Sequence, residues 1–263
     1  MRALLSIHDL MPESRLAVSS MLARLFASIP ALRPEHITLL VVPGRQWSAD
    51  DLVWLRHLSS AGHPLAGHGW AHRATNGRSF SHHLHSMLLS RDAAEHLSRP
   101  AHGVMALVLR CHAWFVEHDL PVGPLYVPPA WAVGQLGKAA QQALPFFLME
   151  TLGGVIRLSD QCHQRLPLVG YEADNTTRAM LLSASNRFNV ALAARTGRIL
   201  RIGLHPFDLQ HHLAAPLIAD LQRVTQFCDY SQLLQSETAN LPVVPLAQYQ
   251  QRGDGAQHGH EHI

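Results

Sequence analysis

The sequence has few cysteines and few charged residues, and each scarcity excludes a class of protein. Three cysteines among 263 residues, with no Cys-x-x-Cys spacing, indicate neither a disulfide framework nor a cysteine-bound zinc site. Charged residues make up 15% of the chain and the net charge is +2, so the basic patch typical of nucleic-acid binding is not expected. We therefore expect neither a disulfide-rich secreted domain nor a nucleic-acid partner.

Long apolar runs are also absent from the sequence. No stretch reaches the ~18–20 apolar residues that a membrane-spanning helix needs, and the apolar run at residues 3–7 is too short for a signal peptide. The sequence has no Gly-x-Ser-x-Gly, Walker or Gly-x-Gly-x-x-Gly motif, which leaves a serine hydrolase or a nucleotide site without support. These features predict a cytoplasmic protein without a transmembrane segment, and they leave its oligomeric state open.

The apolar pattern predicts strands that alternate with helices. Strands are expected at residues 3–7, 37–42, 64–67, 125–127 and 199–204, and helices at 14–29, 48–61, 91–117, 185–196 and 214–230. This alternation is typical of a parallel sheet or barrel, in which active groups collect at the C-terminal ends of the strands. We expect one α/β domain over residues 1–250, followed by a disordered tail, 251–263, rich in Gly and His.

Histidine is the residue that the chain has in excess, with 20 copies against 21 Lys plus Arg. His68 and His72 are four residues apart, so both imidazoles can face one ion, and Gly67 and Gly69 permit close backbone approach. In so histidine-rich a chain, this spacing also fits a pair of surface side chains. Asp9 follows the first predicted strand and adds a carboxylate, although it is equally suited to capping the next segment. The metal hypothesis is Asp9, His68 and His72 around one zinc-class ion.

Three further residues lie near predicted strand ends and suit proton transfer. His8 precedes Asp9 and is a candidate base or a donor to the ligands. His205 follows the predicted strand at 199–204, and it is a candidate general acid with Asp208 fixing the orientation of its imidazole. The structural alternative is a core histidine hydrogen-bonded at a strand end, with Asp208 starting the next helix.

The segment from Tyr126 to Trp131 contains two consecutive prolines and is most simply a rigid turn, with Trp131 filling a gap. Rigid backbone beside a metal can also aim an amide N–H at a developing oxyanion, and an aromatic ring can form a wall for a sugar. On this second interpretation Pro129, Ala130 and Trp131 contact the substrate.

Four motifs, taken in order, resemble those of the metal-dependent polysaccharide deacetylase superfamily, of carbohydrate esterase type, in an uncharacterised branch. The motifs are Ser6-Ile7-His8-Asp9, Gly67-His68-Gly69-Trp70-Ala71-His72, Val127-Pro128-Pro129-Ala130-Trp131 and Leu204-His205-Pro206. The resemblance spans residues 3–235 and implies a deformed (β/α) barrel with fewer than eight repeats. It also implies a metal triad of Asp9, His68 and His72, with His205 as general acid and Ala130 or Trp131 supplying the oxyanion N–H.

The sequence departs from the family at two places. His8 stands where many members have an aspartate that acts as general base, and the arginine that often precedes the proline motif is replaced by Tyr126 or Val127. The expected function is removal of an N-acetyl or related acyl group from an amino sugar, glycan precursor or glycolipid head group, with one divalent metal, Zn²⁺, as cofactor. The alternatives are a catalytically silent carbohydrate-binding barrel and a hydrolase of another C–N bond, such as a deformylase or amidase.

Overall fold

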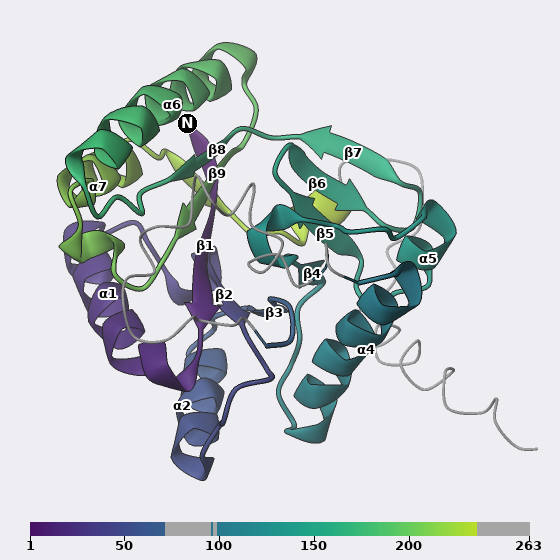
Figure 1. Ribbon diagram of the computed structural model, residues 1–263. Coiled ribbons are helices and arrows are strands. Elements are labelled where there is room, and N and C mark those ends of the chain that lie inside the picture. Colours follow the sequence, from purple (N-terminus) through teal and green to yellow (C-terminus); the bar gives the residue numbers. More distant parts are fainter. Residues whose placement is uncertain (72–95, 97–98, 236–263) are drawn as a thin grey trace, which may run out of the picture.

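The chain is built around a sheet of ten strands that curls into an incomplete barrel, with helices on its outside (Figure 1). The computed structural model describes residues 1–71, 96 and 99–235. Along the sheet the strand order is β7-β6-β5-β4-β3-β2-β1-β9-β8, and β10 pairs with β1 outside this path. The strands are β1 (Arg2–Leu10), β2 (Ile37–Val41), β3 (Leu65–Gly67), β4 (Leu125–Tyr126), β5 (Leu148–Thr151), β6 (Gly154–Arg157), β7 (Cys162–Arg165), β8 (Leu168–Gly170), β9 (Leu200–Leu204) and β10 (Gln226–Cys228).

Strand β1 is the centre of the sheet. On one side it pairs with β9 over residues 3–7, and its other side is shared by β10 at the N-terminal half and β2 at the C-terminal half. All pairings are parallel except those of the β5–β6 and β6–β7 hairpins. Because the parallel strands run the same way, the residues that follow β1, β3, β4 and β9 meet at one end of the barrel.

The two faces of β1 have different surroundings. Ala3, Leu5 and Ile7 belong to the large apolar core between the sheet and the helices, whereas Leu4 belongs to a second, smaller cluster. Since side chains alternate along a strand, Ser6 and His8 share the face of Leu4, which is the inside of the barrel. The interior therefore becomes more polar toward the C-terminal end of β1.

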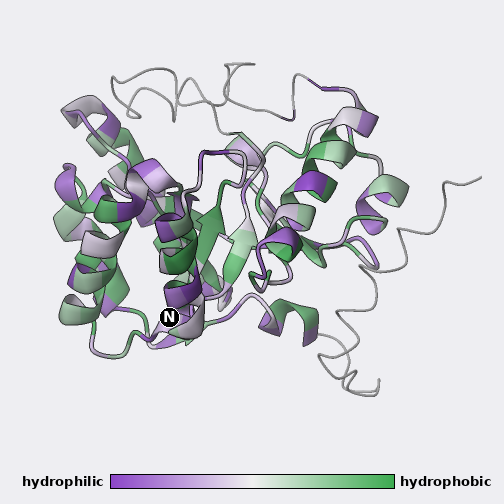
Figure 2. Cartoon of the chain, turned by 90° about the horizontal axis from the view of Figure 1, so that it is seen from below, coloured by the Kyte–Doolittle hydropathy of each residue, from purple (hydrophilic) through white to green (hydrophobic). Residues whose placement is uncertain are grey.

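The helices follow one another around the outside of the curled sheet (Figure 1). They are α1 (Arg15–Ser28), α2 (Ala49–Ser60), α4 (Ala101–Glu117), α5 (Lys138–Gln142), α6 (Thr176–Thr196), α7 (Ala214–Gln222) and α8 (Gln232–Gln235), with 3-10 turns η1 (Pro12–Ser14), η2 (Pro34–His36), η4 (Pro129–Trp131) and η5 (Asp208–Gln210). Figure 2 shows hydrophobic strands in the middle of the molecule and mixed colouring on the helices, as expected when one face of each helix packs on the sheet. Within residues 1–71 and 99–235, none of the helices is both long and apolar enough to cross a membrane.

Helix α2 begins with a capping box formed by Ser48 and Asp51. The Ser48 hydroxyl accepts from the Asp51 amide at 3.2 Å, and the Asp51 carboxylate accepts from the Ser48 amide at 3.1 Å. Replacing Ser48 by alanine removes the first of these bonds, so we expect a loss of about 0.5–2 kcal/mol in the free energy of unfolding. Urea denaturation followed by circular dichroism would measure it, with Ser60→Ala at the other end of α2 as the control. Equal stability of the two variants would contradict the prediction.

The deformed barrel with fewer than eight repeats is confirmed, whereas some of the predicted helices have other bounds in the structure. The stretch expected to be helical over 214–230 is helix only to Gln222, and Gln226–Cys228 forms β10, because pairing with the N-terminal half of β1 buries Phe227 and Cys228. Helix α4 begins at Ala101 with Pro100 as its N-cap, and residues 91–95 and 97–98, where the predicted helix began, lie outside the described residues. Strands β5, β6, β7 and β8 were not predicted, and α6 begins at Thr176, before the predicted start at residue 185. The tail 251–263 lies outside the described residues, so its disorder stays a prediction, as does the boundary at 250.

Candidate active site

Five of the predicted site residues meet at the C-terminal end of the barrel, namely His8, Asp9, His68, Trp131 and His205. His8 is the centre of the group: its ring centroid lies 5.0 Å from that of His68, 5.0 Å from that of His205 and 5.2 Å from the Trp131 ring. These residues come from the ends of β1, β3, β9 and the segment after β4, so segments far apart in the sequence contribute to one site. His72, the third predicted metal ligand, lies outside the described residues.

Asp9 and His68 face each other at the floor of the site. The Asp9 Oδ1 atom lies 3.4 Å from His68 Nε2, and both side chains are buried. Asp9 has a φ of 53°, a left-handed conformation that aspartate and asparagine tolerate better than most residues. The helical segments that follow have Met11 and Ser14 as N-caps, so Asp9 does not serve as the cap that its position in the sequence also allowed.

The chemistry of this pair fits a divalent metal. His68 Nδ1 donates to the Val127 carbonyl at 2.8 Å, which commits the proton of a neutral imidazole to Nδ1 and leaves the lone pair on Nε2, the atom facing the carboxylate. Two ligand bonds of about 2.0–2.1 Å at a tetrahedral angle place their donor atoms about 3.3–3.4 Å apart, which matches the separation of Oδ1 and Nε2. Among the described residues no group of three or more His, Cys, Asp or Glu is placed to hold a metal, and the predicted third ligand is not among them.

Glycine and tryptophan fix the segment that carries His68. The Gly44 amide donates to the Trp70 carbonyl at 2.6 Å, and a Cβ at Gly44 would lie only 2.5 Å from that oxygen. A cation–π contact places the Arg110 guanidinium 3.9 Å from the Trp70 ring centroid. At Gly67, a Cβ would meet the Cys111 sulfur at 2.7 Å. Gly67 therefore permits the close backbone approach that was expected of it, and Gly44, which was not predicted, permits a close approach to Trp70.

His8 lies over the backbone of β9 on the inside of the barrel. A Cβ at Gly203 would come within 3.2 Å of His8 Nε2, so the glycine makes room for the imidazole. The same Nε2 lies 3.3 Å from the Ser6 hydroxyl, two residues earlier on β1. His8 therefore has a defined place between His68 and His205, with its ring centroid 5.0 Å from each of theirs.

His205 lines a cavity that adjoins the site. Its Nδ1 atom is buried and has no hydrogen-bond partner within the described part of the chain. Burial by itself lowers the pKa of His205, but the carboxylates of Glu172, Asp208 and Asp9 outweigh it and raise the pKa. Glu172 follows β8, a strand that sequence analysis missed, and it is itself buried.

Asp208 contacts His205 in a different way from the one predicted. Its Oδ2 atom accepts from the backbone amide of His205 at 2.9 Å, and no bond to the imidazole is present. Burial raises the pKa of Asp208 to about 7, against the opposing effect of His205. Asp208 therefore shapes the turn after β9 and the field around His205, and the imidazole is not hydrogen-bonded to it.

The Pro129–Trp131 turn has unusual backbone geometry. Ala130 and Trp131 both have positive φ, at 53° and 54°, conformations that are costly for residues other than glycine. The Trp131 amide donates to the Pro128 carbonyl at 2.8 Å and closes the turn. Of the two amides proposed to face an oxyanion, that of Ala130 is therefore the better candidate.

Beneath the site lies a buried polar network that sequence analysis did not find. Glu150 accepts from Trp131 Nε1 at 2.8 Å and from the Tyr230 hydroxyl at 2.6 Å, and it forms a buried ion pair with Arg201 at 3.2 Å. Burial and the Glu150 carboxylate raise the pKa of Tyr230 far above its usual value, so it stays a neutral donor. The sequence of residues 200–204 could have indicated a polar interior here. Arg201 and Gly203 share one face of the strand, and Leu200, Ile202 and Leu204 share the other.

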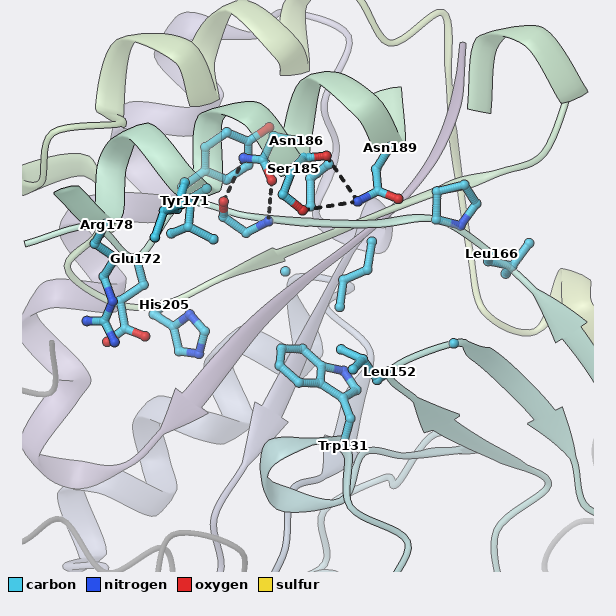
Figure 3. A pocket seen from close by; sticks show the side chains of 18 of the residues that line it. Trp131, Leu152, Leu166, Tyr171, Glu172, Arg178, Ser185, Asn186, Asn189 and His205 are labelled. Atoms are coloured by element: carbon cyan, nitrogen blue, oxygen red, sulfur yellow. Dashed lines mark hydrogen bonds between the residues drawn. The ribbon is translucent and has the colours of Figure 1, made fainter. Parts of the chain in front are cut away.

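A cavity of about 750 Å³ adjoins the site. His205, Glu172, Ala130 and Trp131 line one part of it, and the remainder lies between α6 and the β5–β6 hairpin (Figure 3). A volume of this size is within the usual range for small-molecule sites. Three of the predicted site residues, Ala130, Trp131 and His205, therefore border a space large enough for an organic substrate.

Comparison with solved structures agrees with this architecture. A proposed polysaccharide deacetylase from Mycobacterium smegmatis superposes with a TM-score of 0.51 at 15% identity, over 93% of this chain and 94% of that one. The chain has the polysaccharide deacetylase fold. At 15% identity this likeness shows the fold of the chain, which is the fold that the four sequence motifs predicted.

Two more solved structures resemble this deacetylase fold at TM-scores of 0.47. They are the Xyl-CE4 domain of a multidomain xylanase from the hindgut metagenome of Trinervitermes trinervoides, at 15% identity over 92% of this chain and 93% of that one, and a family 4 acetyl xylan esterase from Clostridium thermocellum in complex with a cobalt ion, at 13% identity over 95% and 90%. No protein-family model matches the sequence, and a search of the curated proteins finds no match.

Proposed function

We propose that this protein is a metal-dependent hydrolase that removes an N-acetyl or related acyl group from an amino sugar. The observation that carries the proposal is the facing pair of Asp9 Oδ1 and His68 Nε2, 3.4 Å apart, with His8 and His205 beside it at the same end of the barrel. The deacetylase fold supports the reaction class, and the C. thermocellum esterase was solved with a cobalt ion.

Asp9, His68 and His72 would hold the metal, and Zn²⁺ is the ion we propose, because imidazole and carboxylate ligands together suit it. When bound, such an ion polarises the acyl carbonyl and lowers the pKa of water. The backbone carbonyl of Val127 orients the His68 imidazole. For His72, the sequence motif alone supports the role of metal ligand.

The remaining residues of the site would position the substrate and move protons. His8 takes the proton of the attacking water, whose oxygen becomes bonded to the acyl carbon, and the Ala130 amide faces the acyl oxygen. As the C–N bond breaks, His205 gives a proton to the leaving nitrogen, so the products are a carboxylic acid and a free amine. The raised pKa of His205 supports this role, because a general acid must carry its proton at the start.

The proposed acid is tested by His205→Ala. We expect turnover to fall by about 10²–10⁴-fold, the usual contribution of a positioned general acid, while bound metal stays unchanged. Acid release from N-acetylglucosamine oligomers by mass spectrometry, together with metal analysis, measures both quantities. His212→Ala, an exposed histidine beyond the same strand, is the matched control and should keep full turnover. Undiminished turnover in His205→Ala would remove His205 from the reaction.

A further inference from the structure

The cavity beside the site is lined by a set of leucines that the proposed reaction does not use. They come from the β5–β6 hairpin, from β8 and the segment before it, and from one face of α6: Leu152, Leu166, Leu168, Leu181, Leu182 and Leu192. Leu181 is 58% exposed and Leu152 is 52% exposed, although both border the same cavity. Single exposed leucines are ordinary, but a group of them on one concave surface marks a site for an apolar ligand.

The two asparagines that α6 contributes to the cavity are already paired within the protein, while Arg165 and Arg198 are charged residues that also line it. Asn186 donates to the Gly170 carbonyl at 2.7 Å and accepts from the Gly170 amide at 3.3 Å, so its side chain completes the outer edge of β8. Asn189 donates to the carbonyl and hydroxyl of Ser185, at 3.1 and 3.4 Å (Figure 3). A sugar would gain little from polar groups that are already engaged, whereas an aliphatic chain would cover the leucines between them.

At the other end of the cavity the polar groups are those of the candidate active site. His205 lies there with a buried Nδ1 that has no partner among the described residues, beside Glu172 and the Trp131 ring (Figure 3). From Arg178 to Leu192 the cavity follows α6 for about 21 Å, at 1.5 Å per residue, well beyond the reach of an acetyl group. The surface thus changes from polar at His205 to largely apolar along α6 within one continuous cavity.

We propose that the substrate is amphipathic and that its aliphatic chain lies between α6 and the β5–β6 hairpin, with its polar head at His205. This inference rests on the proposed function for the position of the head group. The aliphatic chain of the substrate has one of two sources. It is either an alkyl or lipid group attached to the sugar, or the acyl group that is itself removed.

The test compares binding of three probes to the metal-loaded protein: methyl and octyl glycosides of N-acetylglucosamine, and N-octanoylglucosamine, each below its critical micelle concentration. Titration calorimetry should give a Kd at least about tenfold lower for an octyl compound than for the methyl glycoside, since each methylene that is fully buried contributes roughly fourfold. A preference for the octyl glycoside places the chain on the sugar, and a preference for N-octanoylglucosamine makes it the acyl group.

Substitutions of two leucines test whether they cause the preference for octyl compounds. Leu181→Asn combined with Leu152→Asn should reduce the tenfold preference to less than about threefold, because both side chains are already largely exposed and the fold does not depend on them. Met180→Asn is the matched control, since Met180 is the neighbouring residue on α6, is 69% exposed and does not line the cavity. It should keep the full preference.

The outcomes separate this inference from the proposed function. Equal affinity for methyl and octyl compounds overturns the inference even if acetate is released, and so does an equal loss of preference in Met180→Asn and the double variant. A preference for octyl compounds without release of any acid supports the aliphatic site and overturns the proposed reaction. Sedimentation of both variants tests the other occupant: a dimer that dissociates only in the double variant would show that a second copy of the chain fills the cavity, and would also overturn the inference.

Discussion

Replacing Asp9 by asparagine is expected to remove both bound metal and activity while leaving the fold intact. Asparagine has nearly the same shape and tolerates the left-handed conformation of this position, where φ is 53°, so the backbone gains no new strain. It lacks the negative charge that a carboxylate ligand supplies opposite His68 Nε2. Turnover should fall by more than about 100-fold, because loss of a ligand exceeds the cost of losing an outer hydrogen-bond partner.

The measurements are metal content after dialysis, acid release, and the midpoint of urea unfolding of the metal-free protein. Asp119→Asn is a close control, since Asp119 is also an aspartate with positive φ, at 52°, but is exposed at the end of α4. The control should keep its metal and its turnover. Full metal occupancy in Asp9→Asn would remove Asp9 from the ligand set, and the proposed reaction would lose its main support.

The sequence was sufficient for those parts of the site that end a regular strand. The β-branched and apolar runs before Asp9, Gly67 and His205 predicted strands, and parallel strands bring their C-terminal ends together, so His8, His68 and His205 were expected at one place. The helix predicted at 48–61 corresponds to α2, whose Ser48 cap depends only on neighbouring residues. Features determined by local sequence were therefore predictable.

What sequence analysis missed depends on contacts between distant segments. Gln226–Cys228 has apolar positions that suit a helix as well as a strand, and only its pairing with β1 makes it β10. Glu172 was overlooked because β8 is three residues long, too short to give a period. The hydrogen bond from Asp208 to the backbone of His205, and not to its ring, depends on how the turn after β9 closes. None of these facts is visible in the residues next to each position.

The buried pair of Glu150 and Arg201 leads to the largest expected effect on stability. Arg201 has five hydrogen bonds to backbone carbonyls, at 2.7–3.3 Å, and Glu150 is the carboxylate that balances its charge inside the barrel. Glu150→Ala would leave a buried guanidinium without a counterion and would leave Trp131 Nε1 and the Tyr230 hydroxyl without their acceptor. We expect it to lower the free energy of unfolding by about 3–5 kcal/mol.

Three variants separate charge from hydrogen bonding in this network. Glu150→Gln keeps an acceptor for the Trp131 indole, and the Tyr230 hydroxyl can rotate to accept from its amide, so we expect a smaller loss than for alanine. Arg201→Met removes the positive charge and leaves the Glu150 carboxylate without its counterion. The Glu150→Gln/Arg201→Met pair should be more stable than the sum of its single losses predicts, because neither residue then leaves an uncompensated charge. Denaturant unfolding of all four proteins gives the coupling. Strictly additive losses would show that the two charges do not stabilise each other. In that case only the hydrogen bond from Trp131 Nε1 to Glu150 would hold the Trp131 ring beside His8.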